Sequence, residues 1–174
     1  EFNAYTTGDR TAFFIKIIKK RLGTALDILS DMVSNPIFDE KVIEKEKQVV
    51  LKEINMVTDD SRLHQWVLFQ KTLFDRHPAK NPTYGTVAAV KSFDRKKVAG
   101  YYYSHYIPNN MVISVIGNVK NVKASIQKYF GSLKPRHQIK RAMVKEPLQK
   151  KIKKFVEKKK TLNSYMILGY KTVN

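Results

Sequence analysis

The chain has 174 residues, of which 43% are hydrophobic and 11% aromatic, a composition typical of a globular domain and not of a disordered segment. It contains no cysteine, which excludes disulfides, thiolate zinc sites and cysteine nucleophiles. No apolar run approaches the roughly 20 residues of a membrane-spanning helix, and the N-terminus has no signal-peptide pattern. The sequence opens in mid-pattern without Met, so we expect a single domain over residues 1–174, truncated at both ends.

The formal net charge of +18 raises the question of an anionic partner. Clustered lysines could bind nucleic acid, or they could lie on solvated surfaces. Much of the excess lies between Lys134 and Lys160, including the run Lys158 to Lys160, and no zinc-finger, RNA-binding or basic-zipper pattern accompanies it. We therefore expect no nucleic-acid partner. A basic nucleic-acid-binding domain remains a remote alternative, which would require steeply salt-dependent binding.

Local patterns predict the elements in chain order. Residues 2–7 and 10–18 are rich in β-branched and aromatic types around Gly8-Asp9, which predicts a hairpin. Apolar residues recur at helical spacing from Leu22 to Val33, and Asn35-Pro36 ends that helix. A second helix is predicted from Asp39, a candidate N-cap, to about Val57.

Further helices and strands follow in the second part of the chain. Helices are predicted at about 63–74, 86–90, 95–106 and 122–130, and strands at 111–116, 152–157 and 164–170. Asp59, Asp60 and Ser61 offer caps for the helix at 63–74, and Gly131 closes the one at 122–130. The predicted fold class is α+β, with helices packed on one face of a mixed, mainly antiparallel sheet.

Two glutamates stand out on the helix from Asp39 to Val57. With residues about 100° apart, its apolar side chains share an arc of roughly 140°. Glu46 and Glu53 fall near the middle of that arc, about 10 Å apart along the axis. A buried carboxylate needs a cationic partner. Internal salt bridges, a wet cleft and a metal site all remain open on this evidence.

A resemblance extends over nearly the whole chain. The stretch from Glu44 to Glu53 resembles the third-ligand helix of the pitrilysin/insulinase zinc peptidases, and the stretch from Asn3 to Thr11 resembles their substrate-pairing edge strand. Other matching segments are Ala25 to Met32, Asn35-Pro-x-Phe38, His77-Pro78, Gly85-Thr86, Tyr103 to Met111 and Gly117 to Val119. The chain thus resembles one incomplete half of a pitrilysin/insulinase domain pair.

The resemblance implies a zinc metalloendopeptidase that hydrolyses extended peptides by metal-activated water. It implies that Glu53 is a zinc ligand, that Glu46 supports catalysis, and that Asn3 and Ala4 bind the substrate backbone as an added strand. The implied cofactor is Zn²⁺. The implied partners are a peptide substrate and the remaining half of the peptidase or a homologous subunit.

The family signature His-x-x-Glu-His is absent from the 174 residues. The chain has four histidines, and none of them has that spacing: His64, His77, His105 and His137. We expect the signature to precede residue 1 in the parent protein and this chain alone to be inactive. The alternative is a non-catalytic subunit of the same family that acts in binding or assembly. The expected compartment is the bacterial cytoplasm or periplasm, with an organelle as the alternative.

Overall fold

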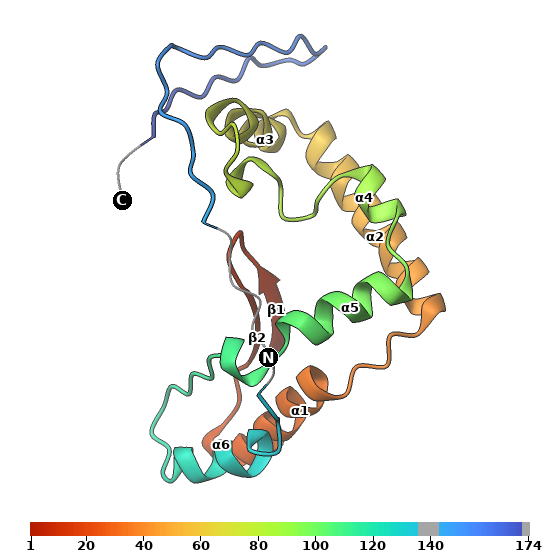
Figure 1. Cartoon of the computed structure of the whole chain (residues 1–174), viewed down its shortest axis with the longest axis vertical. Helices are drawn as coiled ribbons and strands as arrows, with labels where there is room; N and C mark the ends of the chain where they lie inside the picture. Colours follow the sequence, from red (N-terminus) through yellow and green to blue (C-terminus); the bar gives the residue numbers. More distant parts are fainter. Residues whose placement is uncertain (136–142, 172–174) are drawn as a thin grey trace. The chain divides into compact units, whose positions relative to one another are not determined.

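The computed structural model describes residues 1–135 and 143–171, which divide into two compact units. Unit 1 comprises Glu1–Ile43 and Asp94–Arg141, and unit 2 comprises Glu44–Phe93 and Ala142–Asn174. Each unit is described by itself, with elements labelled as in Figure 1. Each unit combines segments from both parts of the sequence.

Unit 1 begins with the predicted hairpin. Strands β1 (Phe2–Thr6) and β2 (Thr11–Ile15) pair antiparallel, from Phe2 opposite Ile15 to Thr6 opposite Thr11. Thr7 N–H donates to the Arg10 carbonyl at 2.8 Å, and the Thr7 hydroxyl donates to the Asp9 carboxylate at 2.7 Å. These bonds close the turn at Gly8-Asp9, so the hairpin prediction is confirmed.

Three helices complete unit 1: α1 (Leu22–Ser34), α5 (Arg95–His105) and α6 (Val122–Phe130). Helix α1 contacts β2 and α6 and buries Ala25 and Leu26. The Tyr102 hydroxyl of α5 donates to the Val33 carbonyl at 2.7 Å, which holds α5 to the end of α1. The unit also has two 3₁₀ helices, η1 (Lys19–Arg21) and η3 (Pro108–Asn110).

Unit 2 is built on helices α2 (Glu40–Asp59), whose first turn belongs to unit 1, and α3 (Ser61–Leu73). Asp60 separates them and caps α3, since its carboxylate accepts from Arg62 N–H at 2.8 Å and Leu63 N–H at 3.2 Å. The short helices η2 (Pro78–Lys80) and α4 (Val87–Lys91) follow. Residues 143–171, here called the strap, run out and back as an extended loop (Figure 1).

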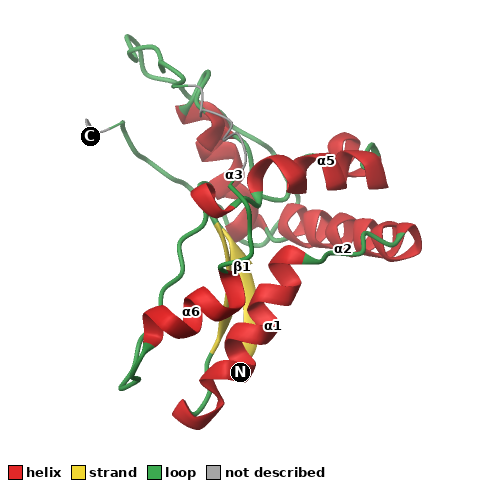
Figure 2. Cartoon of the chain, turned by 60° about the horizontal axis from the view of Figure 1, so that its bottom comes forward, coloured by secondary structure: helices red, strands yellow, loops and turns green. Residues whose placement is uncertain are grey.

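The structure corrects the predicted sheet. All six predicted helices are present within a few residues, but residues 111–116, 152–157 and 164–170 form no strand. Within the described residues β1 and β2 make up a two-stranded sheet, as the yellow arrows of Figure 2 show. The expected buried strand at 111–116 instead exposes Val112 and Ile116 at 96% each. The coarse α+β class holds. The prediction of a mixed sheet covered by helices on one face is wrong for the described residues, because the three segments have no neighbouring strand with which to pair.

No helix in residues 1–135 or 143–171 combines the length and apolar composition that crossing a bilayer requires. The division into two units does not test the expected single domain, which stays a prediction.

Candidate functional site

Helix α2 carries the two glutamates that the sequence singled out. It begins after Asp39, whose carboxylate accepts from Val42 N–H at 3.0 Å and whose carbonyl accepts from Ile43 N–H at 2.9 Å. The predicted N-cap is therefore confirmed. Phe38, just before the cap, has a φ of 53°, and its carbonyl accepts from Arg95 Nε at 3.0 Å. This contact holds the backbone in a region that non-glycine residues rarely adopt.

The structure corrects which face of α2 is buried. Ile54 is buried, and its neighbours Val50 and Val57 are half-buried. Glu46 and Glu53 are exposed rather than core-facing. The apolar arc predicted from periodicity was centred on the glutamates, whereas the packed side is centred about 60° further around the helix, near Ile54. The two carboxylates therefore lie beside the packed side and not within it.

Exposed apolar residues border the glutamates on their other side. Val42 is 54% exposed, Val49 is 41% exposed and Met56 is 61% exposed. These three residues recur every seven positions and so form one row along α2. Glu46 and Glu53 lie between this row and the packed side, about 10 Å apart along the axis.

Neither glutamate has a partner in the described part of the chain. No hydrogen bond or ion pair to Glu46 or Glu53 is formed by residues 1–135 or 143–171, whereas Glu44 on another face pairs with Lys47 at 2.6 Å. The internal salt bridges considered for these two carboxylates are therefore absent among the described residues.

The second candidate feature, in unit 1, is the edge of β1 that faces away from β2 and pairs with no strand among the described residues. Glu1 and Lys16 exchange both backbone hydrogen bonds, at 3.0 and 2.8 Å. In an antiparallel pair this pattern alternates, so Ala4 presents its N–H and carbonyl to the open edge. The Ala4 N–H donates to the Asn3 side-chain oxygen at 2.9 Å. All residues of β1 are exposed, which makes this edge accessible to an added strand.

The described residues contain no complete metal site. No group of three or more His, Asp or Glu side chains in residues 1–135 and 143–171 could hold an ion. His64 faces Glu157 at 3.4 Å, the His77 ring accepts from Ala79 N–H, and His105 lies beside Ser104. His137 lies outside the described residues. Asn3 and Ala4 belong to unit 1, and Glu46 and Glu53 to unit 2, so each pair is described within its own unit.

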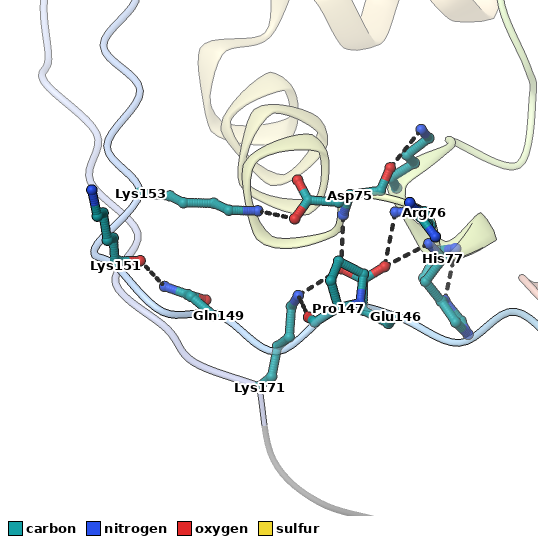
Figure 3. Close-up of polar contacts among 11 residues, drawn as sticks. Asp75, Arg76, His77, Glu146, Pro147, Gln149, Lys151, Lys153 and Lys171 are labelled. Atoms are coloured by element: carbon teal, nitrogen blue, oxygen red, sulfur yellow. Dashed lines mark hydrogen bonds and ion pairs between the residues drawn. The ribbon is translucent and has the colours of Figure 1, made fainter.

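Sequence reasoning missed one cluster, which surrounds Glu146. Its carboxylate accepts three backbone N–H bonds and one lysine ammonium bond (Figure 3). Partial burial alone would raise the pKa of Glu146, but the hydrogen bonds outweigh it and hold this pKa well below its usual value. Little in the sequence indicated this cluster, because Glu146 is one of two glutamates in a lysine-rich stretch.

Comparison with known proteins places both parts of the chain in one family. Residues 1–87 match the family model described as Insulinase (Peptidase family M16), and residues 92–174 match the model described as Peptidase M16 inactive domain. The two matches together cover nearly the whole chain.

Individual relatives agree with the family models. The "Uncharacterized zinc protease YmxG" of Bacillus subtilis is 32% identical over 98% of this chain. The "Probable mitochondrial-processing peptidase subunit beta" of Arabidopsis thaliana is 32% identical over 75% of this chain. The chain spans 41% and 25% of the lengths of these relatives.

Solved structures share the fold. A protease from Helicobacter pylori superposes with a TM-score of 0.79 at 27% identity, covering 84% of this chain and 37% of that one. The periplasmic protease PqqL from Escherichia coli gives 0.73 at 19% identity, covering 84% and 17%, and this likeness concerns the fold alone. From the two family matches and the identity of its relatives, the chain belongs to the insulinase family, peptidase family M16.

Proposed function

We propose that the full-length protein is a zinc-dependent metalloendopeptidase that hydrolyses extended peptides. The observation that carries the proposal is the pair Glu46 and Glu53, which lie seven residues apart on an exposed face of α2 and have no partner in the described residues. The family membership and the relatives named zinc proteases support it.

The two carboxylates have different proposed roles. Glu53 fits the position of the family's glutamate ligand, and a carboxylate oxygen is a normal zinc donor. Glu46 is a positioning residue. It does not contact the metal itself but orients one of the metal ligands or balances the charge of the site. Bound zinc would lower the pKa of a water molecule and polarise the scissile carbonyl. One carboxylate is not a zinc site, so the other ligands must come from a His-x-x-Glu-His segment that these 174 residues do not contain.

The edge of β1 is the proposed substrate-binding element. A peptide lying beside Ala4 would form backbone hydrogen bonds with an edge strand that is already extended and exposed. The Asn3 side chain accepts the Ala4 N–H, so an incoming carbonyl would replace this contact. Binding through the main chain gives affinity with little dependence on the peptide sequence.

Glu53→Gln and Glu46→Gln variants of the full-length protein test these roles. We expect Glu53→Gln to lose zinc and activity together, because a neutral amide is a poorer ligand than a carboxylate. We expect Glu46→Gln to retain zinc but to lower kcat about 10–100-fold, the range typical of residues that support metal ligands. Zinc content by elemental analysis and turnover of an unstructured peptide measure both effects.

The matched control is Glu44→Gln, on another face of the same helix and paired with Lys47. It should leave zinc content and turnover unchanged. If the full-length protein binds no zinc and cleaves no peptide, the proposal fails. A non-catalytic subunit of the same family, acting in binding or assembly, is then the better interpretation.

A further inference from the structure

The strap makes few apolar contacts with the rest of unit 2. Most of its described residues are exposed, including the apolar side chains of Leu148, Ile152 and Leu168. Four strap residues are not exposed: Glu146, Lys153, Ile167 and Lys171. Three of these four are charged, so ionic and hydrogen-bonding contacts must hold much of the strap in place.

The strongest of these contacts meet at Glu146, as Figure 3 shows. One carboxylate oxygen accepts from Asp75 N–H at 2.8 Å and from Lys171 Nζ at 2.6 Å. The other oxygen accepts from Arg76 N–H and His77 N–H, both at 2.8 Å. The side chain of Glu146 is only 15% exposed. We call Glu146, Lys171 and the three amides of Asp75 to His77 the latch.

The chain after α3 is shaped to present these amides. Phe74 ends the helix, and its N–H bonds to the Gln70 carbonyl at 3.1 Å. The next three N–H groups all point to one place, and such successive amides form a concave site for an anion. Of the neighbouring charges, the Asp75 carboxylate is paired with Lys153 at 2.6 Å, and Lys80 Nζ donates to the Asp75 carbonyl at 2.9 Å. The Asp75 carboxylate, the other anionic side chain at this site in the described part of the chain, is therefore neutralised.

The latch joins the two ends of the strap. Glu146 lies near its start and Lys171 at its last described residue, and Lys171 Nζ also lies 5.7 Å from the centre of the Phe74 ring. Between them the strap meets α3 at weaker points, where Glu157 lies 3.4 Å from His64 and Gly169 lies against the Phe69 ring. Each of these involves one partner, and Lys159 Nζ donates to two carbonyls at the end of α2, those of Thr58 and Asp59. Glu146 has four partners.

We propose that the Glu146 latch is the device that docks the strap on α3, and that the strap leaves this helix when the latch opens. Glu146 is a positioning residue in this proposal and takes no part in the chemistry. The latch links the loop at 75–77, within the segment that matches the insulinase model, to two residues of the segment that matches the second family model. It thereby joins residues of these two segments within unit 2, whether or not the protein binds zinc.

The test uses two measurements on the full-length protein. Hydrogen exchange followed by mass spectrometry reports the amides of Asp75 to His77. A zero-length carbodiimide crosslink between Lys153 and Asp75, which lie 2.6 Å apart, reports the docked strap. The variants are Glu146→Gln, Lys171→Gln and the matched control Glu157→Gln, which removes the other carboxylate of the strap.

We expect Glu146→Gln to raise exchange at residues 75–77 at least about tenfold, because hydrogen bonds to a charged group are lost, and to lower the crosslink yield severalfold. Lys171→Gln, which keeps the three amide bonds, should lower the yield less. Glu157→Gln should change neither signal.

Two outcomes would overturn the latch. One is a folded Glu146→Gln variant with wild-type exchange at residues 75–77. The other is faster exchange there with an unchanged crosslink yield, which would reduce Glu146 to a local cap of the loop. If Glu146→Gln does not fold, an unchanged crosslink yield in Lys171→Gln refutes the proposal.

Discussion

At the scale of single residues, the surroundings of each carboxylate decide what it can do. Glu146 accepts hydrogen bonds from four donors, and its side chain is only 15% exposed. Glu46 and Glu53 are exposed, have no partner in the described residues, and lie beside exposed apolar side chains. The first arrangement stabilises structure, and the second leaves two carboxylates without an ion-pair partner among residues 1–135 and 143–171. The same residue type therefore has two very different surroundings in unit 2.

The low pKa of Glu146 predicts a pH dependence of stability. Because the folded-state pKa lies below the usual value of 4.5, its contribution is fully present above that value and is lost as the pH falls toward the folded pKa. We expect the difference in free energy of unfolding between wild type and Glu146→Gln to be constant above about pH 5.5 and to shrink below about pH 4.5. Urea unfolding at a series of pH values measures it. A difference that stays constant down to about pH 3 would contradict the prediction.

At the scale of elements, helices begin and end where local side chains satisfy the backbone. Asp39, Asp60, Thr86 and Asp94 each accept N–H bonds from the first turn of the helix that follows. These contacts involve residues two or three positions apart, so the sequence alone predicts where the helices start. Glycines within a helix and contacts between helices then raise or lower the stability of the fold.

The cap at Asp60 gives a quantitative prediction. Asp60→Ala removes the acceptor of two N–H groups and should lower the free energy of unfolding by about 1 kcal/mol. Asp60→Asn retains an acceptor oxygen and should change stability by only a few tenths of a kcal/mol, since both residues cap well. Thermal unfolding of the two variants measures this, and equal losses would argue against a capping role.

Two helical glycines in unit 1 give a matched pair. A Cβ at Gly100 in α5 would meet no atom within 4 Å, whereas one at Gly23 in α1 would lie 3.1 Å from the Tyr129 hydroxyl. We expect Gly100→Ala to stabilise the fold by about 0.5–1 kcal/mol through the backbone entropy of the unfolded chain. Gly23→Ala should gain less or lose stability, because Tyr129 must move. Chemical denaturation measures both, and a larger gain at Gly23 would refute the argument.

At the scale of the whole molecule, the chain exposes much apolar surface for its size. The segments expected to be strands carry exposed apolar side chains, among them Val112, Ile116, Ile152 and Met166. The chain spans 41% of the length of its Bacillus relative.

This leads to a prediction for the 174 residues alone. With at most one proposed ligand on α2 and no complete group of donors in the described residues, the isolated chain should neither hold zinc tightly nor cleave peptides. Zinc content after dialysis and peptide turnover in the presence and absence of a chelator are the measurements. Turnover that the chelator abolishes would contradict the prediction.

The sequence by itself determined the elements that rest on local interactions. The hairpin around Gly8-Asp9, the helix Val122–Phe130 and the caps at Asp39 and Asp60 were predicted close to their observed bounds, because periodicity and capping act over a few residues. The periodicity that singled out Glu46 and Glu53 also lay within one helix.

The tertiary structure alone decided which residues meet across the chain. Glu146 acts through amides 69 to 71 residues away, and no local pattern encodes such a distance. The buried side of α2 was misplaced because periodicity gives the apolar arc of a helix but not which part of it finds a partner. The strands at 111–116, 152–157 and 164–170 were not formed because a strand exists only where a neighbour pairs with it.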